Sequence, residues 1–212
     1  MRVLICPDSF KGSLTADDAA AAIRAGVEAA ARSVGMPADI AVHPVSDGGE
    51  GFAHLIARAI NARTKARTIP GPLDDPIQCG FAEAQGELFL DAASAIGLPL
   101  VPAGKRNPMR LTSAALGRLI ASALNDHPRA HAVTLGLGGT ATMDMGLGAL
   151  QALGVELQDD QRQPVSIRPP VPEAIARFAT FTVNPGTPAE RLATGRTKLR
   201  LAVDTLTPLL GK

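Results

Sequence analysis

Two short polar loops carry residue types that can do acid–base and electrostatic chemistry. The first loop contains Asp8 and Lys11, and the second contains Asp47 and Glu50 on either side of a Gly-Gly pair. A carboxylate can accept a proton from a hydroxyl substrate, and an ammonium group can neutralise a phosphate during its transfer. Asp47 and Glu50 could also bind a substrate hydroxyl or Mg²⁺. The structural alternative is a solvated loop in the first case and acidic groups in the first turn of a helix in the second.

A third loop is rich in glycine and follows a predicted strand at residues 131–135. It reads Gly-Leu-Gly-Gly-Thr-Ala-Thr over residues 136–142, and we predict a helix after it that runs to Leu153. Glycines let backbone N–H groups approach an anion closely, and a helix N-terminus adds partial positive charge. Threonine hydroxyls add donors, and Asp144 could orient a hydroxyl or hold a metal. The loop therefore fits a phosphate site, although a tight strand-to-helix turn would need similar residues.

The same glycines leave a second interpretation open. Gly136, Gly138 and Ala141 fit the spacing Gly-x-Gly-x-x-Ala, and Glu156 lies 20 residues beyond Gly136, where a ribose-binding acid is expected. An NAD(P)-binding oxidoreductase is thus an alternative. Against it, Asp144 and two further glycines interrupt the place where the helix of such a site should begin.

A basic loop supplies a candidate anion clamp. Arg106 follows Lys105 in this loop, and its planar guanidinium matches the geometry of a carboxylate. The structural alternative is an exposed basic loop with no ligand.

The order of predicted elements brings the first two loops together. Strand and helix patterns alternate over the first 70 residues, which favours a parallel α/β sheet. Thr15 with Asp18 three residues later forms a capping box at the start of the first helix. Ligands of such sheets bind at the carboxyl ends of strands, so both loops should emerge at one edge. The predicted segments are a strand at 2–6, a helix ending at Gly35, a strand at 38–45, a helix at 49–62 and a strand at 64–69.

The pattern changes at Gly71-Pro72, and we expect a second α/β unit with a mixed sheet beyond it. Its predicted segments are a hairpin of 76–83 and 87–91 around Gln85-Gly86, a helix at 113–125, the strand at 131–135 and a last strand at 197–203. We therefore divide the chain into a first domain of residues 1–71 and a second domain of residues 72–212.

Composition excludes several classes of function. The chain of 212 residues has 21 Lys plus Arg and 20 Asp plus Glu, a formal net charge of +1, no Trp, no Tyr and 6 Phe. This balance argues against binding of nucleic acid or of an anionic membrane. The most apolar stretch, 131–155, contains six glycines and Asp144, so it should not span a membrane. The two distant cysteines and the short apolar N-terminal run fit a cytoplasmic protein.

Several motifs together resemble those of the bacterial glycerate kinase family, in the same order and along the whole chain. They are PDSFKGSLTADDAAAAI, PVSDGGEGF, GPLDDPI, KRNP, LGLGGTATMDMGLGALQALGV and VDTLTPLLG. The resemblance implies phosphoryl transfer from ATP, with Mg²⁺, to a hydroxyl of the sugar acid D-glycerate, giving phosphoglycerate and ADP. It also implies two α/β domains with the site in the cleft between them. The first would be a Rossmann- or flavodoxin-like parallel sheet, and the second an inserted α/β domain with a mixed sheet.

The residues that match family motifs supply the predicted site. We expect catalytic roles for Asp8, Lys11 and Asp47. Substrate-binding roles are expected for Ser9, Gly48, Gly49, Glu50, Arg106 and Asn107. Nucleotide and phosphate binding is expected for Gly136, Gly138, Gly139, Thr140 and Thr142, and metal binding for Asp144 and Asp204.

The chain also departs from the family pattern. Met143 and Met145 flank Asp144 where the family usually has Asn and Gly, Ala114-Ala115 replaces an aromatic residue and glycine, and Thr207 stands where Asn precedes Pro. Family members also continue well past the last residue, so we expect the C-terminal part of the first domain to be missing. Bare sheet edges would then favour a complementing C-terminal polypeptide or a homodimer. An inactive or split kinase-like chain, which binds a ligand or partner without turnover, is the corresponding alternative.

Overall fold

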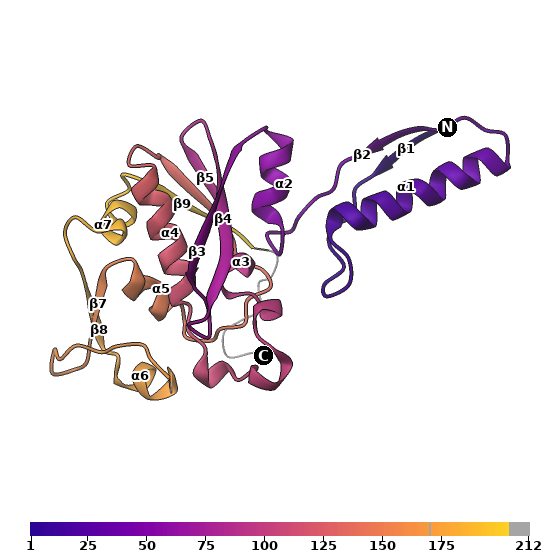
Figure 1. Ribbon diagram of the computed structural model, residues 1–212. Helices are drawn as coiled ribbons and strands as arrows, with labels where there is room; N and C mark the ends of the chain where they lie inside the picture. Colours follow the sequence, from indigo (N-terminus) through magenta and orange to yellow (C-terminus); the bar gives the residue numbers. More distant parts are fainter. Residues whose placement is uncertain (170, 204–212) are drawn as a thin grey trace.

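The first loop-bearing unit is a small parallel β-α-β arrangement. The structure, a computed structural model, describes residues 1–169 and 171–203. Strand β1 (Arg2–Ile5) pairs in parallel with β2 (Asp39–Val42), and α1 (Ala16–Ser33) connects them. Figure 1 shows this unit to one side of the rest of the molecule. The prediction that the loops after both strands emerge at one edge is confirmed, because the two strands run in the same direction.

Helix α1 begins and ends where local sequence signals place its termini. The Thr15 hydroxyl accepts a hydrogen bond of 3.1 Å from the Asp18 N–H, as the predicted capping box requires. The helix ends at Ser33, and Gly35 follows with φ +64°, a conformation that glycine adopts at little cost.

The larger sheet is mixed and has five strands in the order β3-β4-β5-β6-β9. Pairs β3–β4 and β4–β5 are antiparallel, whereas β5–β6 and β6–β9 are parallel. The strands are β3 (Arg63–Pro70), β4 (Pro76–Ala84), β5 (Glu87–Asp91), β6 (Ala132–Gly136) and β9 (Lys198–Ala202). An α/β fold with one parallel and one mixed sheet is therefore confirmed.

One sheet assignment from the sequence was wrong. The segment 64–69, expected as a third strand beside the first two, is β3 and pairs with β4 instead, with Ile69 opposite Ile77. Helix α2 (Phe52–Ala59) likewise packs on β4 and β5 rather than on the small sheet. A strand pattern specifies an extended segment and its buried face, but it does not specify which neighbour satisfies its backbone hydrogen bonds. The domain division at residue 71 stays a prediction, but residues on both sides of it contribute to the larger sheet.

Helices cover both faces of the larger sheet. Figure 1 shows α2 on one face and α4 (Ala114–Asp126) on the other. The main core lies on the α4 side, where α3 (Ala93–Ile96) and α5 (Leu147–Ala152) also pack. Leu88, Leu90 and Val133 of the sheet and Leu119 of α4 are fully buried there. The predicted hairpin is confirmed, with Gln85 and Gly86 both at positive φ.

The remaining elements extend this core. They are the 3₁₀ turns η1 (Leu98–Leu100), η2 (Ala103–Lys105) and η3 (Pro108–Arg110), the antiparallel pair β7 (Val155–Gln158) and β8 (Thr180–Val183), and the helices α6 (Val171–Arg177) and α7 (Pro188–Ala193). Among the described residues, no helix combines the length and apolar character needed to cross a membrane.

Candidate functional site

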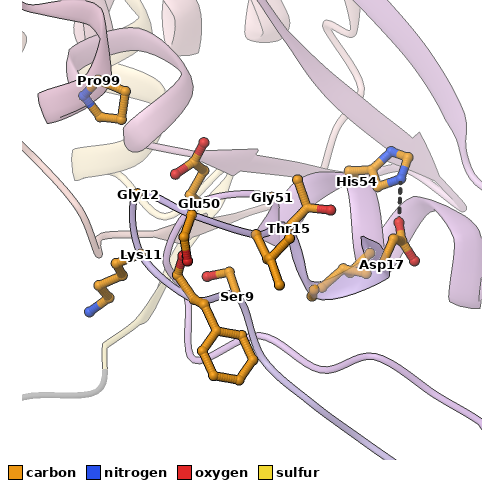
Figure 2. A pocket seen from close by; sticks show the side chains of 14 residues that line it. Ser9, Lys11, Gly12, Thr15, Asp17, Glu50, Gly51, His54 and Pro99 are labelled. Atoms are coloured by element: carbon orange, nitrogen blue, oxygen red, sulfur yellow. Dashed lines mark hydrogen bonds and ion pairs between the residues drawn. The ribbon is translucent and has the colours of Figure 1, made fainter. Parts of the chain in front are cut away.

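The two N-terminal loops line a common pocket of about 570 Å³. The first loop contributes Ser9 and Lys11, and the second contributes Glu50. Figure 2 shows these side chains around the pocket together with His54 of α2 and Pro99 of η1. The structure therefore brings together three of the predicted site residues, and the parallel pairing of β1 with β2 is what places their loops side by side.

Asp8 joins the two loops at their base. One of its carboxylate oxygens accepts from the Ser9 N–H at 2.6 Å, and the other accepts from the Asp47 N–H at 3.1 Å. Asp47 in turn accepts a hydrogen bond of 2.9 Å from the Gly49 N–H through Oδ1. Both carboxylates are thus held in place by backbone donors, and Asp47 Oδ2 accepts no hydrogen bond from the residues described.

Lys11 lies at the exposed tip of a tight turn. Backbone hydrogen bonds between Phe10 and Leu14 close this turn, and Gly12 within it has φ +79°. In the described part of the chain, no carboxylate lies within salt-bridge distance of the Lys11 ammonium. The turn therefore presents a charged group at the pocket that is available to an anionic ligand.

Close backbone contacts join the second loop to the glycine-rich loop after β6. The Gly138 N–H donates to the Gly48 carbonyl at 3.0 Å. A Cβ on Gly136 would lie 2.4 Å from the Gly48 oxygen, and a Cβ on Gly138 would lie 2.7 Å from the Gly49 Cα. Gly48 itself has φ +96° and would place a Cβ 2.5 Å from the Ala202 oxygen. Gly136 and Gly138 are thus needed for close packing against the second loop, and Gly48 is needed for the approach of that loop to β9, whatever else they bind.

The far half of the glycine-rich loop is open to solvent. Gly139 and Thr140 are exposed and Thr142 is half-buried, so these three residues are accessible to a ligand. The helix expected directly after the loop begins only at Leu147. A Rossmann-type dinucleotide site needs a helix N-terminus immediately behind its glycines, so this geometry does not support the oxidoreductase alternative.

Asp144 is a buried structural carboxylate in this structure. Only 1% of its surface is exposed. Its Oδ2 accepts from the Ser113 N–H at 2.8 Å, the Ser113 hydroxyl at 2.9 Å and the Gly148 N–H at 3.1 Å. Its Oδ1 accepts from the Gly146 N–H at 3.1 Å. Asp144 therefore connects the starts of α4 and α5, and this geometry favours a packing role over the predicted metal-binding one.

The predicted metal site is not assembled by the described residues. Across residues 1–169 and 171–203, no group of three or more His, Cys, Asp or Glu side chains is placed to hold a metal ion. Asp204, the second predicted ligand, lies outside the described residues. The described residues therefore do not form a metal site by themselves, and we derive no chemical step through the metal.

Arg106 and Asn107 lie apart from this pocket. The Arg106 Nε donates to the Val101 carbonyl at 3.0 Å. The Asn107 side chain accepts from the Met109 N–H at 3.0 Å and caps η3. Neither residue lines the pocket of Figure 2, so the predicted carboxylate clamp is not assembled with Lys11 here.

An ion-pair cluster at the pocket wall was not predicted from the sequence. Asp17 of α1 pairs with Arg58 of α2 and lies 3.3 Å from the His54 Nε2, the contact drawn in Figure 2. The cluster connects the small unit to α2 across the pocket. No local pattern indicates it, because its members come from helices whose relative position depends on the tertiary fold.

Asp91 is a second residue to which the sequence assigned no role. It is 6% exposed at the end of β5 and accepts hydrogen bonds from the Ala53 N–H at 3.3 Å and the Ser94 N–H at 2.8 Å. Burial raises the pKa of the Asp91 carboxyl, although these hydrogen bonds oppose the shift. Asp91 thus fixes the first turn of α2, which follows the second loop.

Comparisons with known proteins agree with the resemblance of the motifs. The sequence model of the glycerate kinase family matches residues 3–212. The glycerate kinase of Bacillus subtilis (strain 168) is 37% identical over 214 residues, which cover 100% of this chain and 52% of that protein. The glycerate 2-kinase of Escherichia coli (strain K12) is 38% identical over 161 residues, 75% of this chain and 41% of that protein.

A solved structure shares the fold. The crystal structure described as glycerate kinase 2 from Salmonella typhimurium LT2 matches with a TM-score of 0.73 and 30% identity, covering 99% of this chain and 54% of that one. The chain therefore spans about half the length of the relatives that it matches.

Proposed function

This chain belongs to the glycerate kinase family, and we propose on that basis that it acts in the ATP-dependent phosphorylation of D-glycerate. In this reaction a glycerate hydroxyl oxygen forms a bond to the γ-phosphorus of ATP. The bond from that phosphorus to the bridging oxygen breaks, ADP leaves, and the hydroxyl proton passes to a base. The products are phosphoglycerate and ADP.

The observation that carries this proposal is the pocket formed by the two N-terminal loops. Ser9, Lys11 and Glu50 line one cavity of about 570 Å³, a size within the usual range for small-molecule sites. Phosphoryl transfer depends mainly on positioning and on neutralising charge. An exposed ammonium beside hydroxyl and carboxylate groups suits both needs.

The residues of the pocket and of the loops around it suggest a role for each group. Lys11 would neutralise charge on the transferring phosphoryl group, and Asp47 would accept or orient the glycerate hydroxyl through Oδ2. Asp8 would hold both loops at the required separation through its two backbone hydrogen bonds. The open part of the glycine-rich loop, at Gly139 and Thr140, would bind nucleotide phosphates.

Other parts of the proposed site need residues that do not meet in this structure. Arg106 would clamp the glycerate carboxylate only after its loop moves toward the pocket, with Asn107 beside it. Mg²⁺ would enter with the nucleotide phosphates rather than through Asp144, whose two oxygens already accept hydrogen bonds. We further propose a cytoplasmic location, with ATP and a sugar acid as ligands.

Exposed apolar side chains support a proposal about assembly. Leu4 of the small sheet is 66% exposed, and Leu201 of the edge strand β9 is 53% exposed. Uncovered strands of this kind favour pairing with another chain, either a second copy or a complementing polypeptide. A monomer in light scattering across a range of concentrations would contradict the second-copy form of this proposal.

The test of function is ADP release by the purified chain given D-glycerate, ATP and Mg²⁺, with an assay lacking glycerate as the control. Lys11→Ala should lower kcat by orders of magnitude and leave the circular dichroism spectrum unchanged. Lys198→Ala, which removes an exposed ammonium on β9, is the matched control and should keep full activity.

Each outcome of this assay, and of ligand-binding and thermal-stability measurements on the same chain, has a defined meaning. Glycerate-dependent release that survives Lys11→Ala would remove Lys11 from the mechanism. Binding of glycerate without ADP release, by a folded chain, would favour the inactive or split kinase-like alternative. Stabilisation by NADH but not by ATP would favour the oxidoreductase instead.

A further inference from the structure

A second cavity lies beside the start of α4 and is lined by three arginines. It has a volume of about 660 Å³ and is bordered by the first turns of α4, helix α5, the segment that precedes α6 and the turn between β3 and β4. Arg110, Arg118 and Arg168 line it together with the hydroxyl-bearing residues Thr112 and Ser166. It shares no lining residue with the pocket of Figure 2.

The three guanidinium groups come from different parts of the fold. Arg110 ends η3, Arg118 lies in the second turn of α4, and Arg168 lies between β7 and α6. One nitrogen of Arg118 donates to the Pro70 carbonyl at 3.2 Å, which fixes that side chain at the wall of the cavity. Arg110 and Arg168 are exposed.

The side-chain amide of Gln151 helps to hold the wall that carries Arg168. Gln151 of α5 donates to the Val165 carbonyl at 3.0 Å and accepts from the Ile167 N–H at 3.0 Å. Val165 and Ile167 are themselves buried in the core. The backbone on the N-terminal side of Arg168 is therefore anchored, and the cavity is a built feature of the fold.

The charges in this cavity are unbalanced. In the described part of the chain, none of the three arginines forms a salt bridge with a carboxylate. Asp74 is the one acidic residue among those that line the cavity. An adjoining hollow of about 540 Å³ shares Arg110 and Asp74 and adds Lys105. Positive charge therefore exceeds negative charge on the surface that a ligand would touch.

We infer that this cavity binds a small, multiply charged organic phosphate. Guanidinium groups match phosphate oxygens with paired hydrogen bonds, and three of them around one space repel one another until an anion neutralises them. The volume exceeds that of a lone phosphate and falls in the range of small-molecule sites. The site is separate from the proposed phosphotransferase pocket, so it stands or fails independently of the proposed function.

The first experiment measures binding of inorganic pyrophosphate, the simplest probe with this chemistry, by isothermal titration calorimetry at fixed ionic strength. The double variant Arg110→Gln with Arg168→Gln should weaken binding by about tenfold or more, because each exchange removes charge-assisted hydrogen bonds. Both side chains are exposed, so the fold should persist, and circular dichroism checks this. Arg129→Gln, at an exposed arginine that does not line the cavity, is the matched control and should bind like the wild type.

Two further variants distinguish this cavity from the pocket of Figure 2 and from attraction by charge alone. Lys11→Ala should keep the pyrophosphate binding that the double glutamine variant loses, since Lys11 lines the other pocket. Replacing Arg110 and Arg168 with lysine keeps the charge but loses the planar fork, and should give intermediate affinity. Absence of binding to the wild type, equal binding to the double glutamine variant, or loss of binding in Lys11→Ala would each overturn the inference.

Discussion

Replacing Asp144 with alanine should destabilise the protein severely. Its carboxylate satisfies three fully buried donors, which are the Ser113 N–H, the Ser113 hydroxyl and the Gly148 N–H. A buried donor that loses its acceptor costs about 1–3 kcal/mol. We therefore expect Asp144→Ala to lower the free energy of unfolding by about 3 kcal/mol or more, a large part of the roughly 5–15 kcal/mol that stabilises a typical domain.

The isosteric variant Asp144→Asn should lower the free energy of unfolding less than Asp144→Ala does. Asparagine keeps one acceptor oxygen, which can stay with the three buried donors, and its amide would face the Gly146 N–H that Oδ1 now accepts. Only that single contact is lost, so we expect a destabilisation of about 1–3 kcal/mol. The ranking of the two variants follows directly from the unequal division of donors between the two oxygens.

The assay is urea unfolding followed by far-UV circular dichroism, since the chain has no Trp or Tyr for fluorescence. Asp160→Asn is the matched control, because Asp160 is exposed, and it should change stability by less than about 0.5 kcal/mol. Unfolding of Asp144→Ala at the wild-type urea concentration would refute the packing role. Loss of Mg²⁺ binding in Asp144→Asn with no loss of stability would also refute it, because that result would restore the metal-ligand role.

Three other predictions concern residues around the loops and the core. Burial raises the pKa of the Cys79 thiol to about 11. A disulfide reagent at mildly alkaline pH should therefore modify only the exposed Cys6 in the folded chain, and both thiols when the chain is unfolded in urea. Gly48→Ala should lower the free energy of unfolding, measured in urea, by about 1–3 kcal/mol, because φ is +96° and the new Cβ would lie 2.5 Å from the Ala202 oxygen. Wild-type stability of this variant would contradict the close contact. Burial raises the pKa of Asp91 above its ordinary 3.8, so its ionisation should weaken the fold as pH rises through the interval above 3.8. Relative to Asp91→Asn, the free energy of unfolding of the wild type should fall over that interval, and a difference independent of pH would exclude the shift.

Local signals in the sequence were sufficient for individual elements. The capping pair at Thr15 and the positive-φ turn at Gln85-Gly86 each depend on neighbouring residues only, and both are observed. The apolar stripe at 113–125 likewise predicted α4. Motif order identified the family, because it depends only on the order of residues along the chain.

Such local signals did not predict the long-range contacts. Nothing near Asp144 in the sequence shows that Ser113 will donate to it from the start of another helix. The glycines at 136 and 138 were compatible with phosphate binding, but their closest neighbours are Gly48 and Gly49, almost 90 residues earlier. Their lack of a side chain is explained by the approach of two backbones, which only the folded structure displays.

Most of the elements before residue 155, the α/β class, the family and the adjacency of the Asp8 and Asp47 loops follow from the sequence alone, because helix caps, strand patterns and parallel-strand geometry are short-range or generic. The folded structure was needed to show that β3 joins the larger sheet, that hydrogen-bond donors enclose Asp144 and that three arginines line one cavity. Sheet partners, burial and charge clusters depend on which distant segments meet. That choice minimises the free energy of the whole chain and is not encoded in any one segment.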